Sequence, residues 1–415
     1  MNISHMVKQW VNYHEEKQHK YGTIVLVLLG LAFVLADWSL YYFSFAEFII
    51  MAILPILFVV GQLRLNKCQI QTISLIIGLI IFHAFLRDLL NIEPYFYRTT
   101  LQASIKLIFY LFVVTFFYNY IKRNSFEERF LIINNILAIL VITVGLYIVF
   151  SIYNNHEYPY RFLWSFTRDD YKSYYFSGNS DFIRMRSIFS EPAHLGHYLL
   201  IVLAANLSFF KVTLKNVSII IILSLGVFLT FSYSMVITLF IVLSIFLLKN
   251  MNIVNLNKVY LLISILTISV MLFIFRDYIY ETFIQRTINI ISGTDGSAYN
   301  RLVQSWMYVE RHKWWIGNGI NHTPVITNNF AYMLSDLGLF GLIPFIILNI
   351  WIFKNSVILG TLFLMLNISR GSYLGPSFWF LLLFILIYMN RKKDTDIKNG
   401  SVKSFMKNTR KIREK

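Results

Sequence analysis

The stretch RSIFSEPAHLGHYLL changes from polar to apolar and carries four side chains suited to acid–base or anion chemistry: Arg186, Glu191, His194 and His197. Pro192 suits the first turn of a helix, because its φ is fixed and its missing N–H is not needed there. Helix residues three apart share a face, so Glu191 and both histidines line one side. We therefore predict a helix beginning near Glu191 or Pro192, with these groups meeting at a helix start that also attracts anions.

The same group has a simpler interpretation. Glu191 would only cap the helix, and His194 and His197 would lie in the polar interface of a membrane. Both interpretations predict the same helix start, so the sequence alone leaves them open.

A second polar stretch precedes a later apolar run. It contains Arg301, a WWIGNG turn and His322, and the run that follows begins at Asn328. Gly317 and Gly319 in the turn permit tight backbone geometry near a ligand. Asp336 lies eight residues into the run, about 12 Å along a helix.

Composition predicts the elements that must position these groups. Of the 415 residues, 57% are hydrophobic and 14% are charged, and apolar runs of about 20 residues recur, which is typical of a polytopic membrane protein. Because backbone amides must be paired inside lipid, the spans are expected to be α-helices, and the fold all-α. The single cysteine, Cys68, excludes an internal disulfide, and no cluster of metal ligands is expected.

The apolar runs predict twelve spans in one domain covering residues 1–415. They lie at 22–44, 46–63, 70–86, 101–121, 130–153, 193–210, 216–231, 234–248, 259–276, 328–353, 355–369 and 376–390. The excess of basic residues in alternate connections places the amino-terminal segment 1–21 and the basic tail 391–415 in the cytoplasm. The long connections 154–192 and 277–327 then lie outside. We expect the charge of +16 to face anionic lipid through the tail, with no nucleic-acid partner.

Positive charge differs in kind between the two predicted faces. The cytoplasmic side holds 17 Lys and 6 Arg, whereas the outer side holds 11 Arg and only two Lys. The outer set of arginines comprises Arg87, Arg98, Arg161, Arg168, Arg184, Arg186, Arg276, Arg286, Arg301, Arg311 and Arg370. Arginine presents a planar fork that fits phosphate oxygens, so an outer phosphate ligand would explain the difference. The alternative explanation, for most of these arginines, is that they pair with loop carboxylates and lipid headgroups.

Four ionisable groups fall within predicted spans: Asp37, His83, Lys106 and Asp336. Such groups usually face a cavity or a partner. All four lie in the outer halves of their spans, whereas a transporter concentrates them near the midplane. Their positions favour binding or chemistry at the outer leaflet.

Several motifs together carry a family resemblance. RSIFSEP, TFSYS at Thr230–Ser234, Ser-x-x-x-Arg ending at Arg301, W-x-G-x-G and N-x-F-x-x-x-L-x-D-x-G-x-x-G occur in that order. Over residues 180–345 the chain resembles the bacterial O-antigen polymerase and ligase superfamily. The resemblance implies a GT-C-like, metal-independent glycosyltransferase with no cofactor. It would act on undecaprenyl-pyrophosphate-linked oligosaccharides at the outer face of the bacterial plasma membrane.

The resemblance also implies roles for particular residues. Arg186 and Arg301 would bind pyrophosphate. Independently of the resemblance, the acceptor hydroxyl would benefit from a nearby general base, and Glu191 ranks ahead of His194 and His322 because it lies beside Arg186. The substrate-binding residues would be Arg184, His194, His197, Ser232, Asn328 and Asp336. The chain departs from the ligase pattern, because Thr327 and Asn328 stand where ligases have a His-Asn pair.

These observations together predict an inverting polysaccharide polymerase for O-antigen or capsule. Its expected partners are lipid-linked oligosaccharides, membrane lipid, a chain-length regulator and a flippase. The alternatives are an O-antigen ligase, a lipid-linked oligosaccharide flippase or other carrier, and a non-catalytic scaffold. A carrier would need a polar path through the membrane centre, and a scaffold would need no polar convergence at the outer face.

Overall fold

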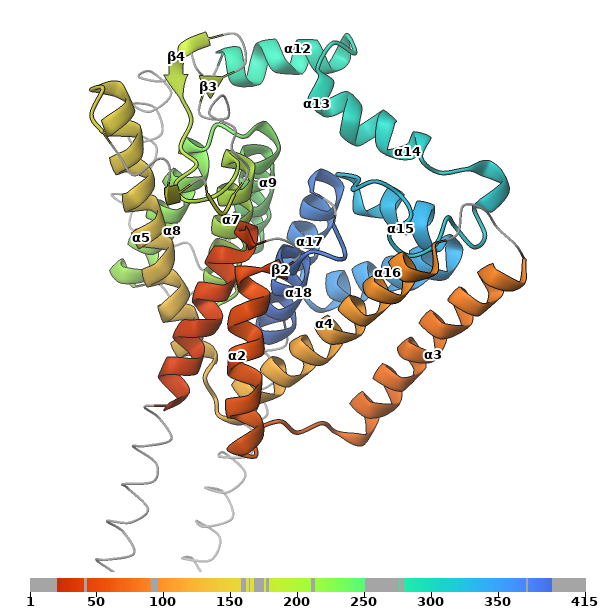
Figure 1. Ribbon diagram of the computed structural model, residues 1–415. Coiled ribbons are helices and arrows are strands. Elements are labelled where there is room, and N and C mark those ends of the chain that lie inside the picture. The colour runs from red at the N-terminus through yellow and green to blue at the C-terminus, as the bar shows by residue number, and fades with distance from the viewer. Residues whose placement is uncertain are drawn as a thin grey trace, which may run out of the picture.

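The protein is described by a computed structural model over residues 21–40, 43–90, 96–157, 162–163, 165–167, 175–176, 179–209, 213–250, 276, 280–370 and 372–389. These residues form an all-α bundle, as predicted (Figure 1). The only sheets among them are two antiparallel hairpins, β1 (Ser39–Leu40) with β2 (Phe43–Ser44) and β3 (Tyr175–Phe176) with β4 (Asn179–Ile183).

The bundle begins with a helix over Tyr21–Asp37, whose last turn is the 3-10 turn η1, Leu35–Asp37. The other long helices are α2 (Phe45–Val59), α3 (Lys67–Leu89), α4 (Tyr97–Arg123), α5 (Glu127–Tyr153), α7 (Pro192–Ser208), α8 (Leu214–Leu229), α9 (Tyr233–Asn250), α15 (Asn329–Leu337), α16 (Leu339–Asn355), α17 (Val357–Ser369) and α18 (Pro376–Tyr388). Short helices form the second long connection: η3 (Tyr280–Gln285), α12 (Arg286–Ile291), α13 (Gly296–Tyr299), η4 (Asn300–Gln304), α14 (Ser305–Met307) and η5 (Arg311–Lys313). They arch over one end of the bundle (Figure 1).

Within the described residues, three helices are long and apolar enough to cross a membrane by length and composition. These are α3, α4 and α5, and seven more apolar helices have 10–17 residues. The twelve predicted spans and the GT-C-like fold therefore stay predictions. Apart from Arg276, the span predicted at 259–276 lies outside the described residues.

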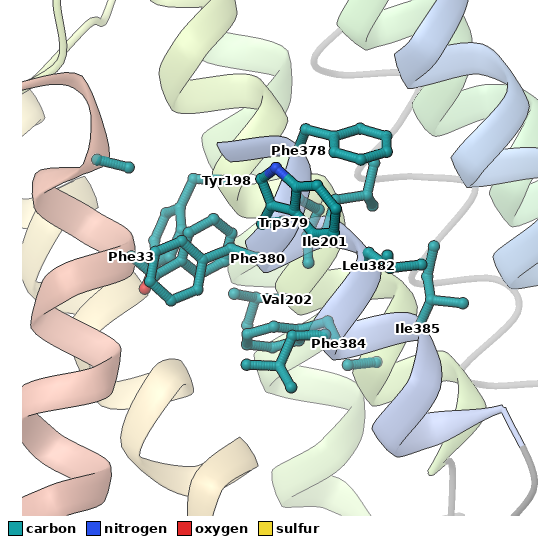
Figure 2. Close-up of a cluster of buried hydrophobic side chains, with 14 of the residues drawn as sticks. Phe33, Tyr198, Ile201, Val202, Phe378, Trp379, Phe380, Leu382, Phe384 and Ile385 are labelled. Atoms are coloured by element: carbon teal, nitrogen blue, oxygen red, sulfur yellow. The ribbon is translucent and has the colours of Figure 1, made fainter. Parts of the chain in front are cut away.

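The core is built around α7 and α18. Fourteen of the 17 residues of α7 and ten of the 13 residues of α18 are buried. A helix that is apolar on every side is expected at the centre of a bundle. The ring of Phe33 packs 4.8 Å from that of Tyr198 and 4.9 Å from that of Phe380, joining the amino-terminal helix to both (Figure 2).

Helix α3 lies at the edge of the bundle (Figure 1). Only four of its 23 residues are buried: Ile73, Ile80, His83 and Arg87. The carboxyl-terminal end is fixed to the second long connection, where His83 Nε2 lies 2.6 Å from the carbonyl oxygen of Ile316. Arg87 Nη1 lies so close to Gly319 that a Cβ there would stand 1.9 Å from it.

The structure confirms one predicted boundary and corrects two. The helix of the opening stretch begins at Pro192, with Glu191 at its N-cap position. The run 22–44 is not one helix, because the chain leaves the helix at Asp37 and forms the β1–β2 hairpin. The run 328–353 is also broken, at Gly338, whose φ of 61° and ψ of −151° cannot continue an α-helix.

Candidate functional site

The two long connections bring three arginines together near the start of α7. Arg184 lies between β4 and α7, Arg286 begins α12, and Arg301 lies in η4. Their charges act on one another. Burial, reinforced by the positive charges of Arg286 and Arg301, lowers the pKa of Arg184 to about 10. We call Arg184, Arg286 and Arg301 the arginine cluster.

Arg301 likewise experiences more positive than compensating negative charge. Burial, followed by the charge of Arg286, lowers the pKa of its guanidinium, and the carboxylates of Asp295 and Glu191 offset this only in part. Arg301 Nε is buried and has no hydrogen-bond partner among the described residues. A guanidinium in this position is expected to bind an anion strongly, because burial weakens competition from water.

The carboxylates available to the cluster are few. Arg286 Nε forms an ion pair with Asp295 Oδ2 at 2.8 Å, and its guanidinium lies 5.6 Å from the ring centre of Tyr233. Arg184 Nε donates to the carbonyl oxygen of Thr230 at 3.3 Å. Neither Arg184 nor Arg301 forms an ion pair within 4 Å with any residue of the described chain. The cluster thus has more cations than carboxylates in contact with them.

Arg186, the predicted pyrophosphate ligand, is fully buried at 0% exposure. The chain turns inward after it, because Ser187 has a φ of 54° and its Oγ donates to the carbonyl oxygen of Val141 at 2.6 Å. Its predicted meeting with Arg301 over one diphosphate stays a prediction. Arg286 was not predicted as a site residue, although it belongs to the outer set of arginines.

Glu191 does not act as a simple helix cap. It holds the N-cap position of α7, but its side chain accepts no capping hydrogen bond. Its negative charge instead raises the pKa of Arg184 and of Arg301 on one side and of Arg370 on the other. Glu191 therefore acts electrostatically on the arginine cluster and also on Arg370, which belongs to a second polar group.

That second group joins three helices that are distant in sequence. Arg370 Nη2, after α17, donates to Asp37 Oδ1 at 2.9 Å. The other oxygen, Asp37 Oδ2, contacts His194 Nδ1 and accepts a 3.0 Å hydrogen bond from Ser190 Oγ. Asp37 was recognised in the sequence only as an ionisable group within a span, and its partners could not be identified there. His197, one turn along α7 from His194, is also buried.

Asp336 has a different environment. Its Oδ2 accepts hydrogen bonds of 2.8 Å from the backbone N–H of Asn321 and from the hydroxyl of Tyr373. Its Oδ1 accepts one of 2.9 Å from the backbone N–H of Thr323. Both carboxylate oxygens therefore accept hydrogen bonds from protein donors, and the carboxylate holds the turn that follows WWIGNG in place.

The glycines of that turn allow backbone to pack on backbone. A Cβ on Gly317 would lie 2.5 Å from the backbone of Asp336, and one on Gly338 would lie 2.4 Å from that of Trp315. Both residues have positive φ. Gly317 therefore has a structural role in this contact, and a Cβ on Gly319 would meet the side chains of Arg87 and His322, whereas the prediction for Gly317 and Gly319 was tight backbone geometry near a ligand.

The remaining predicted residues lie around these groups. His322 Nε2 accepts from the N–H of Phe96 at 2.9 Å, at the start of α4. Asn328 caps α15 and donates to the carbonyl oxygen of Arg301 at 3.4 Å, so it helps to position that backbone. Ser232 is buried between α8 and α9, and its N–H donates to Thr230 Oγ1.

Within the described part of the chain, no group of three or more His, Cys, Asp or Glu side chains is placed to hold a metal ion. Comparisons of the sequence with protein-family models and with curated proteins found no match. The functional inference therefore depends on the geometry of the site.

Proposed function

We propose that this chain is a polysaccharide polymerase of the bacterial plasma membrane. It would transfer a growing glycan from undecaprenyl pyrophosphate to a lipid-linked repeat unit at the outer face, with inversion and without a metal ion. The observation that carries this proposal is the arginine cluster, in which Arg184 and Arg301 lie together without ion-pair partners in the described residues. A diphosphate, which spreads several negative charges over oxygens matched to guanidinium forks, is a suitable ligand.

The surface supports the placement in a membrane. Large apolar side chains are exposed along α2, α3 and α5, including Phe58 at 73%, Phe85 at 61% and Phe150 at 62%. Soluble monomers rarely expose apolar surface on this scale. The arginine cluster and Asp37 lie near one end of the bundle, which we place at the outer leaflet, and cytoplasmic amino- and carboxyl-terminal segments are part of the same proposal.

In the proposed reaction, the arginine cluster stabilises the departing diphosphate. Negative charge on the leaving oxygen grows as the bond to the anomeric carbon breaks, so preformed positive charge stabilises the transition state more than the ground state. The leaving group needs no proton, because a pyrophosphate is already a stable anion.

The acceptor hydroxyl is the weaker reactant, and Glu191 is the best-placed base. Its carboxylate takes the hydroxyl proton while the acceptor oxygen attacks the anomeric carbon and the diphosphate leaves with the bonding electron pair. A single displacement of this kind inverts the configuration. His194 is the second candidate, since its contact with Asp37 through Nδ1 leaves Nε2 to act as acceptor.

Gene deletion with complementation tests the proposal. We expect the deletion strain to carry single repeat units in place of long surface glycan, and the wild-type chain to restore the polymer. Accumulation of free lipid-linked polymer would instead identify a ligase, and accumulation of lipid-linked units on the cytoplasmic side a flippase. An unchanged glycan profile would overturn the proposal.

A further inference from the structure

A polar cavity lies beside Asp37. Glu191 acts electrostatically on Arg370 in its wall and on Arg184 in the arginine cluster. The cavity has a volume of ≈ 180 Å³ and lies between α7, the end of the Tyr21–Asp37 helix and the α17–α18 connection. A cavity volume of about 10–15 Å³ is enough to hold one water, so this cavity is large enough for a ligand. Its polar lining comprises Asp37, His197, Asn367, Arg370, Ser372 and Ser377.

His197 is one of the residues that line this cavity. Its side chain is 4% exposed, yet it makes no hydrogen bond with any described residue. A buried polar group without a partner is costly, so a ligand or water in the cavity is expected to supply one. The imidazole of His197 is thus a binding group available to a cavity ligand.

The start of α18 forms another wall. Gly375 holds the N-cap position, and no side chain caps the helix there. Ser377, in the first turn, lines the cavity, and its backbone N–H is one of the amides that a helix leaves unpaired at this end. The helix start and His197 are independent observations that point to the same space.

The chemistry of the lining favours a neutral polyol over an anion. Arg370 and the helix start would attract negative charge, but the carboxylate of Asp37 lies in the same wall and forms an ion pair with Arg370. Carboxylate, hydroxyl and imidazole groups side by side offer both acceptors and donors, as sugar hydroxyls require. The ring of Phe378 adds an apolar surface for sugar C–H groups.

We propose that this cavity is a subsite for one neutral sugar residue of the glycan, an inference that rests on the proposed function. Its position suits transfer. Glu191 acts electrostatically on Arg370 in the cavity wall and on Arg184 and Arg301 in the cluster. The carboxylate is therefore close enough to act electrostatically on both the wall of the sugar subsite and the proposed diphosphate site.

Sugar binding is measured by saturation-transfer NMR on the purified full chain in lipid nanodiscs. The probes are glucose, galactose, N-acetylglucosamine and N-acetylgalactosamine, each alone, and inorganic phosphate as a competitor. We expect at least one sugar to give a signal that His197→Phe, which removes the ring nitrogens but keeps an aromatic ring, reduces about tenfold. His312→Phe makes the same change at an exposed histidine of η5 and should leave the signal intact.

Ser377→Leu provides a second test, because Ser377 is only partly buried and a larger side chain there narrows the cavity without disturbing the α7 core. A sugar signal that persists in both cavity variants, or no signal from any of the four sugars, overturns the subsite. Competition by phosphate at equal concentration would show an anion site instead. Since binding is measured without polymerisation, sugar binding together with an unchanged glycan profile in the deletion strain would reject the proposed function alone.

Discussion

The arginine cluster and Asp336 both include motif residues, but they differ in how their charges are compensated. In the cluster, Arg184 and Arg301 lie near a third cation and form no ion pair within the described residues. Asp336 is fully buried, and its two oxygens accept three hydrogen bonds from protein donors. A charge whose partners are all internal stabilises the fold, whereas charges of one sign left unbalanced are suited to an external ligand.

This contrast separates two roles that look alike in the sequence. The motif arginine Arg301 and the motif aspartate Asp336 are both ionisable residues near a predicted outer face. In the structure Arg301 lies near other positive charges, whereas Asp336 accepts hydrogen bonds from backbone amides of the turn beside it. Substitutions should therefore change activity at the first position and stability at the second.

The largest effect is expected from Arg301→Met, which keeps most of the side-chain volume but removes the charge. Loss of one group that stabilises developing charge costs about 10²–10³ in rate, so surface polymer should disappear at normal protein level. Thermal stability should stay equal or rise, because repulsion within the cluster falls. Arg301→Lys keeps the charge but not the fork and should give intermediate polymer.

The matched control is Arg311→Met, an exposed arginine in the same connection. It should leave both polymer and thermal midpoint unchanged. Full polymer from Arg301→Met would remove the cluster from the mechanism.

The second effect in size is a loss of stability in Asp336→Ala. Three donors, the N–H groups of Asn321 and Thr323 and the Tyr373 hydroxyl, would lose their acceptor. Buried donors left unpaired cost about 1–3 kcal/mol each, so the thermal midpoint and the protein level should fall clearly. Exposed Asp88→Ala serves as the control. A normal midpoint combined with lost polymer would move Asp336 to the substrate site.

The third effect tests the backbone contact beneath Asp336. Gly338 has a φ of 61°, and a Cβ there would stand 2.4 Å from the Trp315 backbone, so Gly338→Ala should cost about 1–3 kcal/mol in the free energy of unfolding. Gly78→Ala, in α3, meets nothing within 4 Å and should instead stabilise the helix by about 0.5–1 kcal/mol. The two substitutions should shift the thermal midpoint in opposite directions, and equal shifts would argue against the contact.

The smallest effect concerns His322 and pH. Burial, followed by the charge of Arg87, lowers the pKa of the imidazole below its usual 6.5, although its hydrogen bonds to backbone oppose this shift. The neutral ring accepts the N–H of Phe96, so its contribution to stability is present above pH 6.5 and is lost as the pH falls through the lowered pKa. The difference in thermal midpoint between wild type and His322→Ala should therefore shrink on acidification. A difference that grows in acid would show that the charged form is preferred.

Much of the local structure was predictable because it depends on near neighbours. Pro192 marks the first turn of α7, and the apolar runs before residue 154 correspond to the helices from Tyr21–Asp37 to α5, except that the first helix ends at Asp37. The break at Gly338 was not predicted, because the run continues apolar on both sides of it. Its cause is a contact with Trp315, which a hydropathy pattern does not record.

The partners within the candidate sites were less accessible to sequence reasoning. Asp37 was noted as an ionisable group within a span and Arg370 only as a member of the outer set of arginines, and 333 positions separate the two residues. Lys106, likewise noted within a span, pairs with Glu47 at 2.9 Å. Such pairs depend on how helices pack, and periodicity says only which face is apolar.

The sequence by itself determined the helical class, the start of α7 and the types of charged group available near one end of the bundle. These follow from hydrophobic runs, the geometry of proline and the chemistry of side chains, which are local properties. Only the tertiary structure decided that Arg184 and Arg286 join Arg301, that Asp336 serves its own turn, and that a polar cavity opens beside Asp37. Each of those depends on the distance between segments remote in the chain, which is set by packing around α7 and α18.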